Sequence, residues 1–147
     1  FLHADSEISD DAVRAIMQAF SDGHMGGYFR FRLLGPRSLR KRLIEYSVAQ
    51  RCKFGGIPYG DQALFVTAAE YERAGGHEPL PLFDEFRLVR QLMRSDRFHL
   101  LPLSVGVDAR RWEKKSFILH SVKNRLYSLA FTLGVSPSRL ARWYHNR

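Results

Sequence analysis

The chain has 147 residues, 45% of them hydrophobic, and its 23 Lys and Arg against 15 Asp and Glu give a formal net charge of +8. This length and composition support one domain with an ordinary core and exclude a disordered chain, while a single cysteine, Cys52, excludes a disulfide framework or a cysteine-based zinc site. The positive charge favours anionic partners such as nucleotide phosphates, nucleic acid or an anionic membrane face.

The first residues predict a short strand over positions 1–4, with Asp5 just beyond its carboxyl end. His3 and Asp5 would then point to the same face. An apolar start without Met predicts that an amino-terminal half of the protein is missing from the chain. There is no signal peptide and no apolar stretch of membrane-spanning length, and with one cysteine this predicts a reducing, cytoplasmic compartment.

Helices and strands alternate along the middle of the chain. Helical or alternating spacing of apolar residues predicts the elements, and glycine and proline separate them. Leu39, Leu43 and Tyr46 mark the predicted inner side of the second helix. In chain order the predicted elements are a helix over 11–20, a strand over 28–34, a helix over 38–53, a strand over 63–67 and helices over 68–74 and 84–95.

The carboxyl-terminal part predicts strands over 98–101 and 105–107, around Pro102, followed by helices over 115–133 and 137–145. Mixed helices and strands without a clean βαβ repeat predict an α/β or mixed α+β layer fold. The organisation predicted is therefore a single domain over 1–147 in which 114–147 forms a carboxyl-terminal helical pair.

Asp84 and Glu85 begin the predicted helix over 84–95. Asp84 is a good N-cap residue. Glu85 shares a helix face with the apolar residues at positions 88, 89 and 92, so it is predicted to face a cleft or a partner, where a carboxylate can act as a general base. The alternative is a first-turn glutamate that is turned to solvent.

Three further groups are candidates for ligand contacts. Asp5 at a strand end could bind a divalent cation, or could simply form an Asx turn. Gly60 could let another group approach the backbone while Asp61 and Gln62 bind hydroxyl groups, or the segment could form a plain turn. Arg111 and Trp112 suit phosphate binding and sugar stacking, although an exposed helix-entry cluster has the same pattern. Motifs of nucleophile-elbow hydrolases, P-loops, dinucleotide folds and zinc proteases are absent from the sequence.

The carboxyl-terminal helices offer a competing interpretation. Ala130, Gly134, Leu140 and Trp143 have spacings found in helix-turn-helix proteins, and arginines follow on the second helix at 139, 142 and 147. A basic helix-turn-helix DNA-binding protein is therefore the alternative function. The plainer interpretation is two packed helices, with Ser136 as N-cap and Pro137 in the first turn.

The stretch from Lys114 to Leu133 is amphipathic and contains four basic residues. It could bind peripherally to the surface of an anionic membrane. The favoured interpretation is that its apolar residues belong to the core.

Several segments occur in an order that resembles the carboxyl-terminal half of a family 2 glycosyltransferase with the GT-A fold. The nearest subgroup is the bacterial one associated by name with arsenosugar biosynthesis. The Tyr-Gly-Asp-Gln segment and the Arg-Arg-Trp-Glu segment are the most specific parts. The resemblance rests on His3-Ala4-Asp5-Ser6 and on residues 27–32, 58–66, 81–85 and 109–113.

The resemblance implies an inverting, metal-dependent transfer of a sugar from a nucleotide-diphosphate donor to an acceptor hydroxyl. The family's metal-binding motif corresponds to His3-Ala4-Asp5, so Asp5 would hold Mg²⁺ or Mn²⁺. Its acidic pair corresponds to Asp84 and Glu85, with Glu85 in the position of the base. The order of the two acids is reversed here, which adds one methylene to the base.

Substrate contacts are implied for His3, Gly60, Asp61, Gln62, Arg111 and Trp112. The family's nucleotide-binding half has no counterpart in this sequence, so the chain would be an acceptor-side fragment that could be inactive alone. The implied partners are the nucleotide-diphosphate sugar and the acceptor, with no specific nucleic acid. A homodimer could cover the sheet edge left open by the missing half. The location implied is cytoplasmic, or peripheral at the inner membrane face.

Overall fold

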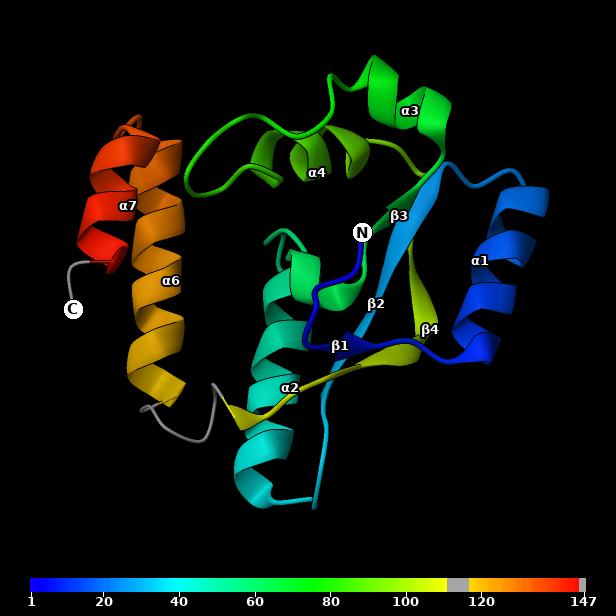
Figure 1. The fold of residues 1–147 in the computed structure, drawn as a ribbon, viewed down its shortest axis with the longest axis horizontal. Helices are drawn as coiled ribbons and strands as arrows, with labels where there is room; N and C mark the ends of the chain where they lie inside the picture. Colours follow the sequence, from blue (N-terminus) through cyan, green and yellow to red (C-terminus); the bar gives the residue numbers. More distant parts are fainter. Residues whose placement is uncertain (111–116, 146–147) are drawn as a thin grey trace.

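The structure is a computed structural model that describes residues 1–110 and 117–145. Within these residues four strands form one mixed sheet in the order β1-β4-β2-β3 (Figure 1). The central strands β2 and β4 run parallel, and the edge strands β1 and β3 are antiparallel to their neighbours. The predicted mixed α/β class is therefore confirmed. The strands are β1 (Ser6–Glu7), β2 (Gly26–Leu33), β3 (Phe65–Val66) and β4 (Phe98–Val107).

The helices lie close to their predicted places in the chain. The two short strands predicted around Pro102 are one continuous strand, β4, whose pairing with β2 shifts register between Tyr28 and Arg30. A 3-10 turn, η1 (Gly60–Gln62), precedes β3. The α-helices are α1 (Asp10–Ser21), α2 (Leu39–Lys53), α3 (Ala68–Arg73), α4 (Phe86–Leu92), α6 (Phe117–Thr132) and α7 (Pro137–His145).

Side-chain caps fix where three of these helices begin. The side chains of Ser9, Ser38 and Thr67 each accept a hydrogen bond from the backbone N–H three residues later. Such a bond satisfies one of the amide groups that a helix leaves unpaired in its first turn. Local sequence thus determines the starts of α1, α2 and α3.

The core consists of three apolar clusters arranged around the central strand pair. Helix α1 packs on Phe29 and Val105, and helix α2 packs on Phe31 and Leu33. Helix α4 belongs to a third cluster, which includes Tyr28 and other residues near the start of the two central strands. Each cluster therefore joins one helix to both β2 and β4.

The strand predicted over residues 1–4 is wrong. The N–H of Ser6 donates to the carbonyl of His3, which makes a turn at this point, and the strand begins only at Ser6. Asp5 therefore precedes a strand instead of following one. Its carbonyl accepts a hydrogen bond of 3.0 Å from the N–H of Asp108, just after β4, so Asp5 still lies at the carboxyl ends of the parallel strands.

The predicted inner face of α2 is also wrong. Leu39 and Leu43 are 73% and 54% exposed, and Tyr46 is exposed as well. The buried residues are instead Ile44, Val48 and Lys41, whose Nζ donates to the carbonyl of Leu34 at 2.6 Å. This bond places the lysine stem against the sheet and rotates the helix away from the face that its leucines indicate.

Helix α4 begins at Phe86, two residues later than predicted. Glu85 occupies the cap position and its side chain makes no capping bond, so the prediction of Asp84 as N-cap is wrong. The apolar face predicted for this helix is confirmed, because Leu88, Val89 and Leu92 are buried.

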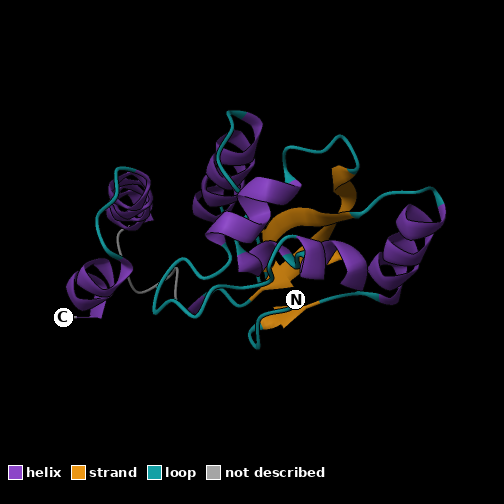
Figure 2. Cartoon of the chain, turned by 90° about the horizontal axis from the view of Figure 1, so that it is seen from above, coloured by secondary structure: helices purple, strands orange, loops and turns teal. Residues whose placement is uncertain are grey.

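Helices α6 and α7 lie together to one side of the sheet, beyond α4 (Figures 1 and 2). The N–H of Arg139 donates to the Ser136 side chain at 3.4 Å, and Leu140 is buried, as expected for packed helices. Val122, Leu126 and Leu129 are exposed, so they do not belong to the core. None of the helices within the described ranges is long and apolar enough to cross a membrane.

Candidate functional site

Three segments far apart in sequence meet at Gly60. The backbone N–H of Gly60 hydrogen-bonds to the Glu85 carboxylate. On the other side the His3 ring lies so close that a Cβ built on Gly60 would be 2.6 Å from His3 Nε2. A side chain at position 60 would therefore have to displace the imidazole of His3. The turn η1 therefore joins the amino-terminal segment to the start of α4.

The pKa of Glu85 is raised well above the ordinary value of a glutamate. Burial of its carboxyl group, reinforced by the neighbouring Asp84 carboxyl, raises its pKa from 4.5 to about 7. Hydrogen bonds from its own backbone N–H and from that of Gly60 act in the opposite direction but are weaker. A carboxyl group with a pKa near neutrality can accept a proton from a substrate and release it again.

Asp61 follows Gly60 in the chain and lies in a shielded environment. Its Oδ1 atom is hidden from solvent and has no hydrogen-bond partner within the described part of the chain. Burial raises the pKa of Asp61, the charges of Arg51 and His3 lower it, and the charge of Asp5 raises it. These influences place Asp5, His3 and Arg51 around one carboxylate, and an unpaired buried oxygen is unusual enough to indicate a ligand contact.

The side chain of Gln62 makes hydrogen bonds that hold the fold together. Its Nε2 donates to the carbonyl of Phe29 at 3.1 Å, and its Oε1 accepts from Arg51 Nη2 at 2.9 Å and from Cys52 Sγ at 3.5 Å. The Arg51 guanidinium also lies 3.8 Å from the centroid of the Tyr59 ring. Gln62 therefore anchors η1 to β2 and to the end of α2, and does not point toward Glu85.

Two residues with strained backbone flank the site. Ala63, which directly follows η1, has φ = 47°, and Phe83, which directly precedes the acidic pair, has φ = 66°. Residues other than glycine rarely adopt this left-handed region, and such strain is concentrated at functional sites.

The structure brings together six of the nine residues that the sequence predicts for the site. Gln62 lies nearby but is turned into the core. Arg111 and Trp112 lie outside the described residues. Arg51 completes the electrostatic surroundings of Asp61 but is not among the predicted residues, since an arginine near a helix end is ordinary. The six that meet are His3, Asp5, Gly60, Asp61, Asp84 and Glu85.

The donor atoms suit a hard divalent cation only in part. Within the described residues no group of three or more His, Cys, Asp or Glu side chains could hold an ion. Mg²⁺, however, takes one or two protein carboxylates and completes its shell with substrate phosphates and water. Asp5 and Asp61 are the two carboxylates that such an ion would use, and the charge of Asp5 raises the pKa of Asp61.

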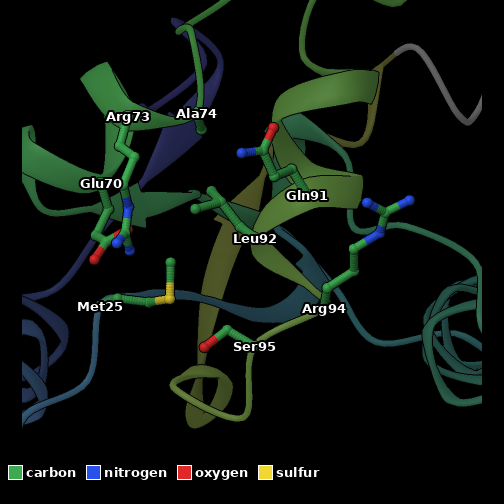
Figure 3. A pocket seen from close by; sticks show the side chains of 8 residues that line it. All are labelled: Met25, Glu70, Arg73, Ala74, Gln91, Leu92, Arg94 and Ser95. Carbon is green, nitrogen blue, oxygen red and sulfur yellow. The ribbon is translucent and has the colours of Figure 1, made fainter.

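A separate hollow of about 260 Å³ lies between α3 and α4 (Figure 3). Its acidic side chain, Glu70, is already paired with Arg73 and, at 3.2 Å, with Arg97. None of the predicted site residues lines it. The hollow is therefore separate from the residues that meet at Gly60.

Comparison of the chain with protein-family models, with curated proteins and with solved structures gives no match.

Proposed function

We propose that this chain is the acceptor-side half of an inverting glycosyltransferase domain of the GT-A type, which transfers a sugar from a nucleotide-diphosphate donor to an acceptor hydroxyl. One observation carries the proposal: the half-buried Glu85 carboxyl group lies at the N–H of Gly60 within a cluster that also contains His3 and Asp61. The ordered motifs that resemble family 2 glycosyltransferases support the same reaction.

Glu85 would act as the general base. Its carboxylate takes the proton of the acceptor hydroxyl while the hydroxyl oxygen attacks the anomeric carbon of the donor sugar. The bond between that carbon and the diphosphate oxygen breaks, and the diphosphate leaves with the electron pair. Attack opposite the leaving group inverts the anomeric configuration.

His3 and Asp61 would position the acceptor. The His3 ring faces Gly60 next to Glu85, and Asp61 offers an unpaired oxygen to a hydroxyl group or to an ion. Asp5, helped by Asp61, would hold a divalent ion, which when bound stabilises the negative charge of the diphosphate. Arg51 balances the charge of Asp61 and keeps it in place through Gln62.

The decisive experiment compares two matched substitutions in the protein that contains this chain. Transfer is measured with nucleotide-diphosphate sugars and hydroxyl acceptors for Glu85→Gln and for Glu72→Gln, an exposed glutamate on α3. Loss of a general base is expected to slow transfer by roughly 10²–10⁴-fold, with the control unaffected. Turnover of Glu85→Gln close to that of the unmodified protein would refute the assignment.

Donor binding is measured separately by titration calorimetry with Mn²⁺ and nucleotide diphosphates. Glu85→Gln should bind as the unmodified protein does, because the base does not hold the donor. Asp5→Ala should lose the metal-dependent part of the binding.

A further inference from the structure

The positive charge of the chain is concentrated at its carboxyl end. Residues 114–147 contain seven Lys and Arg and no Asp or Glu, whereas residues 1–113 contain sixteen basic and fifteen acidic residues. The last 34 residues therefore carry +7 of the formal +8. Most of the excess positive charge lies on α6, α7 and the residues next to them.

Helix α6 is attached to the rest of the molecule through Phe131. Its ring stacks on Phe83, with centroids 5.1 Å apart, and meets Phe86 edge-on at 5.1 Å. Phe131 is also packed against the core cluster that contains α4. This contact defines which side of α6 faces the protein.

The opposite side of α6 is an exposed apolar stripe. Successive residues of an α-helix are rotated by about 100°, so Val122, Leu126, Leu129 and Leu133 fall within an arc of about 60°, nearly opposite Phe131. Their exposed fractions lie between 47% and 76%. The N–H of Leu133 donates to the carbonyl of Leu129, so the helical path continues to the last of them.

Basic residues border this stripe. By the same rotation Lys123 and Arg125 lie on its two sides. Helix α7, which is joined to α6 by a 3.3 Å hydrogen bond from the Tyr127 hydroxyl to the Trp143 carbonyl, carries the exposed residues Arg139, Arg142 and Trp143. An apolar stripe between cations, with an exposed tryptophan nearby, is typical of helices that lie in a membrane interface.

We propose that the face formed by the α6 stripe and its bordering basic residues docks on an anionic phospholipid surface. The apolar side chains would enter the boundary between headgroups and acyl chains, and the cations near the surface would be attracted to the anionic headgroups. This role does not depend on the glycosyl transfer proposed above.

Charge complementarity separates this partner from two others. A second copy of the chain would bring two faces of high positive charge together, which disfavours self-association through α6. A nucleic acid would satisfy the cations but would leave four large apolar side chains in water. An anionic membrane offers negative headgroups to the basic residues and an apolar interior to the stripe.

Vesicle co-sedimentation tests the proposal with two matched double substitutions. Leu126→Gln with Leu129→Gln alters the stripe, and Leu39→Gln with Leu43→Gln makes the same chemical change on the exposed side of α2. The unmodified chain should bind phosphatidylserine-containing vesicles and bind phosphatidylcholine vesicles weakly. The α6 pair should weaken binding at least about tenfold, and the α2 pair should leave it unchanged. Circular dichroism of both variants establishes that they are folded.

Three outcomes would overturn the proposal. Equal loss of binding in the two double variants, or no sedimentation of the unmodified chain, would exclude docking through α6. Binding of duplex DNA at the same protein concentration, lost in Arg139→Gln with Arg142→Gln but retained by the α6 pair, would assign the face to nucleic acid. A dimer in solution that is lost in the α6 pair would assign it to a second copy.

Discussion

Glu85 experiences opposing effects on one carboxyl group. Burial and the adjacent Asp84 favour the protonated form, and the N–H of Gly60 favours the charged form. The first two effects dominate, so Glu85 binds its proton more tightly in the folded protein than in the unfolded chain. This imbalance has a consequence for stability that can be measured without any substrate.

The Glu85→Gln variant should show a weaker dependence of stability on pH. Below pH 4.5 Glu85 is protonated in both states, and between pH 4.5 and 7 the unfolded chain releases the proton first, so the free energy of unfolding falls as pH rises. Removing the carboxyl group should reduce the fall between pH 5 and pH 8 by about 2 kcal/mol. Urea unfolding at the two pH values measures this difference.

The control for this experiment is Glu72→Gln, which removes an exposed carboxyl group from α3. It should leave the pH dependence unchanged. Burial also raises the pKa of Asp61, so part of the fall should remain in Glu85→Gln. Identical pH profiles for Glu85→Gln and the unmodified chain would mean that Glu85 is as solvated when folded as when unfolded.

Much of the candidate site can be predicted from residue types and their order. Glu85 combines a carboxylate with an apolar helix face, and Gly60 stands in a turn next to polar residues. The side-chain direction of Gln62 could not be predicted, because it depends on Arg51 and on the Phe29 carbonyl, which are distant in sequence. The effect of Arg51 on the pKa of Asp61 could not be predicted either, because the two residues come together only in the folded chain.

At the scale of elements, the central strand pair depends on a close approach at Gly27. A Cβ built on Gly27 would lie 2.2 Å from the carbonyl oxygen of His99 in β4 and 2.8 Å from the Phe65 ring. A backbone carbonyl within a parallel ladder cannot move aside without breaking strand pairing. Gly27 therefore allows β2 to sit between β3 and β4 at this level.

Gly27→Ala should destabilise the protein by about 3 kcal/mol, because β2 must separate from β4 to admit the methyl group. Gly23→Ala is the matched control: its φ is 84°, but no atom lies within 4 Å of the added carbon, so only backbone strain of about 1 kcal/mol is expected. Thermal unfolding of both variants gives the comparison. Equal losses would show that the Gly27 contact is not restrictive.

The elements themselves follow the sequence where a local signal exists. The helices predicted to begin at 11, 38 and 68 begin at Asp10, Leu39 and Ala68, each directly after a residue whose side chain caps the helix. The buried face of α2 could not be predicted, because apolar and charged residues alternate without a clear helical period and the Lys41 contact with the Leu34 carbonyl decides the rotation. The strand predicted over residues 1–4 fails for a similar reason, since a turn at Ser6 replaces the apolar alternation.

At the scale of the molecule, α6 and α7 depend on a small aromatic contact. Phe131→Ala removes the ring that packs on Phe83 and Phe86, at a cost of about 2 kcal/mol. Hydrogen exchange should then become at least about tenfold faster in α6 and α7, while β2 and β4 keep their protection. Leu129→Ala, which removes an exposed side chain from the other side of α6, should change neither. Unchanged exchange in Phe131→Ala would show that other contacts hold the two helices.

The parallel pairing of β2 with β4 also determines when the candidate site can form during folding. Gly26 pairs with Phe98, 72 positions away, and both η1 and the acidic pair belong to the connection between these strands. Closing so long a connection costs conformational entropy that no local contact repays early, and contacts of this range slow folding. Asp5, whose carbonyl accepts a hydrogen bond from Asp108 just after β4, is therefore expected to join the other carboxylates only after this closure. A chain stalled before this closure would contain capped helices but no assembled carboxylate cluster.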